Sequence, residues 1–87
     1  MSRFENLKAQ LEQQDWPGVY WFKFIIANDN QKMAQLSALF DEHTELQFHN
    51  SSNGKYVSVS AKLVMMDAES VIEIYRQAAE IEGIISL

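Results

Sequence analysis

Residues 19–27 form an almost unbroken apolar run, Val-Tyr-Trp-Phe-Lys-Phe-Ile-Ile-Ala, in which Lys23 carries the single charge. Aromatic and β-branched residues favour a strand, and near-continuous apolarity is typical of a central strand whose faces are both largely covered. Because side chains alternate along a strand, the run divides into two sets. One set has no charge and should face the core: Tyr20, Phe22, Phe24 and Ile26. Trp21 and Lys23 then lie on the opposite face.

The remaining sequence predicts three helices and three more strands. Residues 1–15 indicate an amphipathic N-terminal helix with Ser2 at its N-cap, and Pro17 follows it as a stop. The apolar stripe of this helix consists of Phe4, Leu7 and Leu11. Further along, apolar spacing and turn residues predict helices over about 30–40 and 67–82, and strands over about 44–50, 56–65 and 84–87.

The order of these elements, after the first helix, is β-α-β-β-α-β, the split βαβ pattern. We therefore predict an α+β, ferredoxin-like domain over residues 16–87, preceded by the N-terminal helix of residues 1–15. Right-handed crossovers give an antiparallel sheet with two helices on one face and with the first and third strands in the centre. The other face of the sheet is then free of crossover helices.

Asn53-Gly54 predicts the hairpin between the second and third strands. This dipeptide favours a two-residue type I′ turn, in which both central residues have positive φ. The resulting register places Phe48 opposite Val59 and Glu45 opposite Lys62, so that apolar residues meet on one face and an acid meets a base on the other. A one-residue slip breaks these matches.

Composition excludes several classes of function. The chain has 7 Lys and Arg against 12 Asp and Glu, a net charge of -5, which argues against nucleic acid as a partner. It has no cysteine, which removes thiol chemistry and cysteine-ligated metals. No apolar run approaches the roughly 20 residues that span a bilayer, and the start of the chain does not resemble a secretory signal. We expect a cytoplasmic protein with no membrane partner.

The two histidines do not indicate catalysis or metal binding. His43 lies near acidic residues but lacks the spacing of a metal-ligand motif. In the predicted register His49 faces Ser58, yet neither an orienting carboxylate nor oxyanion donors are assigned to this pair. The expectation is therefore no catalytic residue, no metal, no cofactor and no enzymatic activity.

The helix-free face is the candidate site. Its predicted residues are Trp21, Lys23, Ile25, Ser58, Ser60, Lys62 and Val64. Trp21, Ile25 and Val64 form an apolar centre, and a large exposed apolar patch usually marks an interaction surface. Either the N-terminal helix or a second copy of the chain could cover it. The lysines and serines could hold a small anionic ligand; alternatively, Lys62 pairs with Glu45 and Lys23 extends into water.

The hairpin carries a family resemblance. Ser51-Ser52-Asn53-Gly54-Lys55-Tyr56-Val57-Ser58-Val59 resembles the signature hairpin of the YbeD-like family, small bacterial proteins of unknown function. The similarity extends to Trp16-Pro17 and Phe22-Lys23-Phe24-Ile25, and covers about residues 15–87. It implies a ferredoxin-like fold related to ACT domains, which sense small molecules. Where the family usually has Gly after the first strand, this chain has Ala27-Asn28-Asp29.

Two hypotheses of function follow. The leading one is a non-enzymatic interaction or regulatory module that self-associates through the helix-free sheet face, as a homodimer, or binds another protein there. The alternative, which the resemblance suggests, is an ACT-like sensor of a small polar metabolite such as an amino acid.

Overall fold

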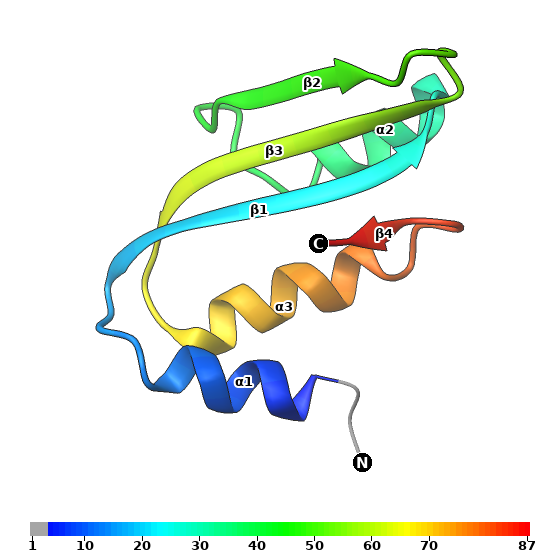
Figure 1. The fold of residues 1–87 in the computed structure, drawn as a ribbon. Helices are drawn as coiled ribbons and strands as arrows, with labels where there is room; N and C mark the ends of the chain where they lie inside the picture. Colours follow the sequence, from blue (N-terminus) through cyan, green and yellow to red (C-terminus); the bar gives the residue numbers. More distant parts are fainter. Residues whose placement is uncertain (1–3) are drawn as a thin grey trace.

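The computed structural model describes residues 4–87, which form a four-stranded antiparallel sheet and three helices (Figure 1). The elements are α1 (Glu5–Glu12), β1 (Gly18–Ala27), α2 (Asn30–Ser37), β2 (Leu46–Asn50), β3 (Tyr56–Met65), α3 (Ala68–Ala78) and β4 (Ile85–Ser86). The strand order is β2-β3-β1-β4, and every neighbouring pair is antiparallel. With β1 and β3 central, this is the predicted α+β, ferredoxin-like arrangement.

The alternation of β1 places its uncharged set in the core. Phe22 and Phe24 are completely buried, whereas Trp21, the residue before Phe22, is 70% exposed. The core also takes Leu36 from α2 and Val71 from α3, so both crossover helices pack on the face that Phe22 occupies. The predicted division of β1 into a core face and an open face is therefore confirmed.

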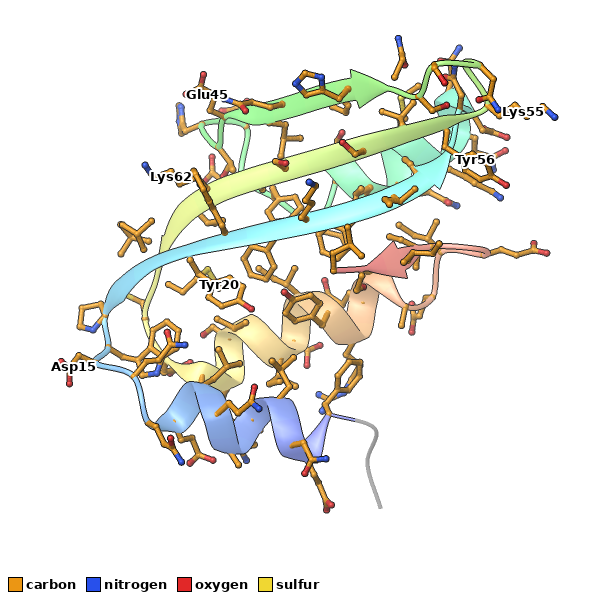
Figure 2. All side chains as sticks on the ribbon, viewed as in Figure 1. Asp15, Tyr20, Glu45, Lys55, Tyr56 and Lys62 are labelled. Atoms are coloured by element: carbon orange, nitrogen blue, oxygen red, sulfur yellow. The ribbon has the colours of Figure 1, made fainter. Side chains whose placement is uncertain are left out.

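Aromatic rings of β1 and α3 form the centre of the core. The Tyr75 ring lies 5.3 Å from the Phe22 ring and 5.8 Å from the Phe24 ring, measured between centroids. Its hydroxyl is 3.0 Å from the hydroxyl of Tyr20, which points from β1 toward α3 (Figure 2). Burial, helped by this hydrogen bond, raises the pKa of Tyr75 above its ordinary value of 10.0. The Tyr75 hydroxyl therefore stays protonated in the folded protein at neutral pH.

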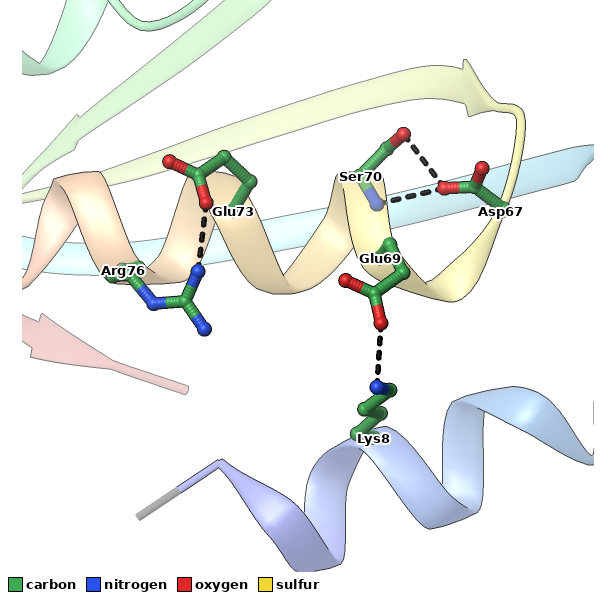
Figure 3. A network of polar contacts seen from close by, with 6 residues as sticks. All are labelled: Lys8, Asp67, Glu69, Ser70, Glu73 and Arg76. Carbon is green, nitrogen blue, oxygen red and sulfur yellow. Dashed lines mark hydrogen bonds and ion pairs between the residues drawn. The ribbon is translucent and has the colours of Figure 1, made fainter. Parts of the chain in front are cut away.

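Helix α1 packs beside α3, at the side of the molecule away from β2 (Figure 1). Leu11 is only 2% exposed and belongs to the core cluster, and the Trp16 Nε1–H donates to the Leu11 carbonyl at 2.8 Å. Lys8 pairs with Glu69 of α3 (Figure 3). Of the two covers considered for the helix-free face, α1 is therefore not the one, because it packs against α3. Ser2, its predicted N-cap, lies outside the described residues; Phe4 occupies the N-cap position.

The hairpin has the predicted register but not the predicted turn. Phe48 pairs with Val59, and the same register continues to Asn50 opposite Val57. However, no described residue other than glycine has positive φ, so a type I′ turn at Asn53-Gly54 is wrong. Instead, residues 51–55 connect the strands: the Gly54 N–H donates to the Ser51 carbonyl at 2.9 Å, and Gly54 takes a φ of 72°.

Helix α2 is shorter than its apolar pattern suggests. It ends at Ser37 rather than near Phe40, and β2 starts at Leu46 rather than near residue 44. As a result, Phe48 on edge strand β2 points to the helix side of the sheet but stays 48% exposed. Helix α3 also ends early, at Ala78, and Gly83 lies in the loop that follows.

Asp67 caps α3, as predicted. Its Oδ1 accepts hydrogen bonds from the Ser70 hydroxyl at 2.7 Å and the Ser70 N–H at 2.8 Å (Figure 3). These bonds, the hydroxyl's first, hold the pKa of the Asp67 carboxyl below its ordinary value of 3.8. The ionised carboxyl thus stabilises the fold above the pKa it has in the unfolded chain. This contribution is lost as the pH falls through the lower pKa of the folded state.

We expect Asp67→Ala to lower the melting temperature at pH 7, because the first turn of α3 loses its N-cap. The variant should also lose less stability than the wild type on acidification below about pH 4, because the titrating group is gone. Thermal unfolding followed by circular dichroism across a pH series measures both effects. Asp15→Ala is the control, since no side-chain hydrogen bond of Asp15 exists in the described structure; equal behaviour of the two variants would contradict the capping role.

Candidate functional site

The residues predicted on the helix-free face do lie together. In the β1–β3 register Trp21 is opposite Lys62, Lys23 is opposite Ser60, and Ile25 is opposite Ser58. Val64 stands opposite Val19 in the same ladder. Since directly opposed residues point to the same face, all seven predicted residues share the face opposite Phe22. We refer to it as the open face.

One part of the open face is apolar. Its exposed residues lie on β1, on β4 and at both ends of β3: Val19, Trp21, Tyr56, Val64, Ile85 and Leu87. Each is more than half exposed, with Val64 at 61%. Ile25, half-buried, lies opposite Ile85 and connects the two strands. This group, with Ile25, is the apolar half of the open face.

Ile85 and Leu87 are the members that sequence reasoning missed. Ile85 pairs with Ile25, and the Leu87 N–H donates to the Lys23 carbonyl at 2.9 Å, which continues the same ladder. A short terminal strand offers no turn and few cross-strand matches to fix its register on β1. The alternation of Ile84, Ile85 and Leu87 alone did not determine which of these side chains lie on the open face.

The other part of the open face is polar and hollowed. A depression of about 440 Å³ is lined by side chains of β1, β3 and the start of β2, among them Trp21, Lys23, Glu45, Gln47, Ser60 and Lys62. Figure 2 shows Lys62 and Glu45 toward the same end of the sheet, far from the hairpin with Lys55 and Tyr56. We refer to this depression as the hollow.

Among residues 4–87, no carboxylate forms an ion pair with either lysine of the hollow. The Lys62 ammonium lies 5.3 Å from the centroid of the Trp21 ring, a cation–π contact. The expected ion pair between Lys62 and Glu45 is not among the ion pairs of the described residues, which join Lys8, His43 and Arg76 to carboxylates. Lys23 likewise has no carboxylate partner within residues 4–87.

Charge is distributed unevenly over the fold. The strands contain Lys23 and Lys62 but no Asp or Glu, although the whole chain has 12 acidic residues and a net charge of -5. The acidic residues lie on the helices and in the connecting segments. The strand residues of the open face therefore carry positive charge and no negative charge.

The histidines stand apart from any catalytic arrangement. His49 is opposite Ser58 in the β2–β3 register, but no hydrogen bond joins their side chains in the described structure. His43 lies in the loop before β2, exposed, with its Nε2 3.9 Å from Glu42. Within residues 4–87, no three His, Asp or Glu side chains come close enough to hold a metal ion.

The polar residues of the hairpin bind one another and β1. The Asn53 Oδ1 accepts from the Ser51 hydroxyl at 2.8 Å and from the Lys55 N–H at 3.0 Å, while the Ser51 Oγ accepts from the Tyr56 N–H. Asn28, which follows β1, donates from Nδ2 to the Gly54 carbonyl at 2.8 Å. This network gives the hairpin sequence a structural role: it fixes the loop and ties it to the end of β1.

These features describe a small α+β protein whose sheet has one face that no described helix covers. The chain belongs to the family described as "Protein of unknown function (DUF493)", whose model matches residues 12–87. This is the YbeD family. Neither the curated proteins nor the solved structures include a significant match to this chain. In residues 4–87 no helix has the length and apolarity needed to cross a membrane.

Proposed function

We propose that this protein is a non-enzymatic interaction module that forms a homodimer through the apolar half of its open face. The observation that carries the proposal is the exposure of Val19, Trp21, Val64, Ile85 and their neighbours on one side of the sheet, while α1 packs elsewhere. Exposed apolar patches of this extent mark interaction surfaces in proteins of this size.

A second copy suits this surface better than a charged partner. The apolar half contains no charged side chain, so two copies can bring it together despite a net charge of -5 on each. Lys62 lies on β3, and Lys23 lies on β1 between Trp21 and Ile25. Their long side chains can carry the ammonium groups past the apolar residues into water. A chain of this length also buries a limited core, and association adds buried apolar area.

An ACT-like amino-acid site at the end of β1 is less well supported. The Asn28 N–H donates to the Lys55 carbonyl at 2.9 Å and its side chain donates to Gly54. Asp29 caps α2 through hydrogen bonds from Gln31 and Lys32. The polar groups of this turn are thus already used within the fold.

Sedimentation equilibrium of the wild type and of Val64→Lys tests the proposal. A lysine within an apolar contact has to be desolvated, so we expect the dimer dissociation constant to rise roughly tenfold or more. Phe48→Lys is the matched control, because it places the same charge at an exposed apolar position on the other side of the sheet. A wild type that stays monomeric at millimolar concentration, or equal weakening by both variants, would overturn the homodimer.

A further inference from the structure

We propose that the hollow binds a small organic anion, a carboxylate attached to a flat apolar group, between Lys23, Lys62 and the Trp21 indole. This site shares Trp21 with the apolar half, and its occupation does not require dimerisation. Its volume of about 440 Å³ is in the range of small-molecule sites in proteins.

The two lysines are the first argument. Lys23 is opposite Ser60 and Lys62 is opposite Trp21, so the lysines occupy diagonal positions on adjacent central strands. Positions related in this way are about 7–8 Å apart, a separation at which two ammonium groups can contact one anion. In an acidic chain these neighbouring cations repel each other, and neither forms an ion pair with a carboxylate in the part of the chain that the structure describes. A bound anion would remove that repulsion.

Hydrogen-bond donors around the lysines are free. The Ser60 hydroxyl and the Gln47 amide line the hollow, and neither makes a hydrogen bond in the described structure. Together with the ammonium groups they offer donors from four positions on three strands. Charge-assisted hydrogen bonds from such groups are the strong contacts by which proteins hold carboxylates.

The side chains that line the hollow indicate the shape and the orientation of the rest of the ligand. The Trp21 ring is largely exposed and supplies a flat apolar surface, which suits an aromatic or otherwise planar group. Glu45 lies on the rim at the β2 side. Its carboxylate repels an anion, so the ligand's charged end should lie toward β1 and β3, against the lysines. A neutral molecule of the same shape lacks this attraction.

Titration with benzoate, followed by ¹H–¹⁵N NMR at a protein concentration where the chain is monomeric, tests the site. We expect a dissociation constant of about a millimolar or tighter, as for fragments of this size. The amide shifts should concentrate on Trp21, Lys23, Ser60 and Lys62. Benzamide, which has the same planar ring without the charge, should bind at least roughly tenfold more weakly.

Three variants make the test specific. Lys23→Gln and Lys62→Gln should each weaken benzoate binding roughly tenfold or more, because each removes a charged donor. Glu45→Gln should strengthen binding, since it removes the repulsion at the rim. Lys55→Gln, at the hairpin far from the hollow, is the control and should leave the dissociation constant unchanged.

Two results would overturn the anion site: shifts outside the hollow, or benzoate affinity that is equal to that of benzamide and insensitive to both lysine variants. Absence of benzoate binding up to about ten millimolar would also overturn the site, because a specific site binds a fragment of this size more tightly than that. Because these measurements use the monomer, they are independent of the Val64→Lys result on dimerisation.

Discussion

Phe22→Ala is expected to leave most of the chain unfolded, whereas Trp21→Ala is expected to change the free energy of unfolding little. The two residues are neighbours on β1, but Phe22 is completely buried and Trp21 is 70% exposed. Removing a buried phenylalanine costs about 3–5 kcal/mol, which approaches the whole stability of a domain of this length. Trp21 loses only surface contacts, among them that with Lys62.

Urea denaturation followed by circular dichroism measures both variants, at a protein concentration low enough to keep the chain monomeric. Phe24→Ala, equally buried on the same face, should behave as Phe22→Ala does. If Trp21→Ala proved as destabilising as Phe22→Ala in the monomer, the division of β1 into a core face and an open face would be wrong.

Leu11→Ala is expected to lower the free energy of unfolding by about 3 kcal/mol. Leu11 is 2% exposed and belongs to the same core cluster as Val71 and Tyr75, so its removal leaves a cavity where α1 meets α3. The family match begins at residue 12, just after this side chain. The loss of stability would show that α1 is a structural part of the domain.

Glu12→Ala is the control for this prediction, because Glu12 is exposed on the same helix. Urea denaturation should show little change for it. If Leu11→Ala were as stable as the wild type, α1 would not contribute to the core. It could then detach from α3 and cover another surface. In that case the open face could be covered by α1 after all.

Alternation and cross-strand chemistry were the reliable signals in the sequence. The β1 residues without a charge were assigned to the core face because the opposite assignment would have buried Lys23. The hairpin register was predicted from a turn at Asn53-Gly54 and supported by cross-strand matches such as Phe48 with Val59; it is confirmed although the turn differs. The turn differs because residues 51–55 permit a longer connection in the same register, closed by hydrogen bonds of Ser51 and Asn53 that a dipeptide rule does not contain.

The position of α1 and the pairing of β4 lay beyond the sequence. An apolar stripe of Phe4, Leu7 and Leu11 shows that a helix needs a partner, but the exposed side of α3 and the open face both offer one. Only the packed structure distinguishes them. The hollow was anticipated in part: its lysines and Ser60 were expected on one face, while the contact of Lys62 with Trp21 in place of Glu45 depends on side-chain conformation.

Acrylamide quenching of Trp21 fluorescence as a function of protein concentration tests the open face and its dimer most directly. In Trp16→Phe the indole of Trp21 is the sole tryptophan reporter. The indole should be freely quenched in dilute solution and become protected over the same concentration range in which sedimentation detects the dimer. An indole that is shielded even at the lowest concentration, or equally accessible in monomer and dimer, would contradict the account.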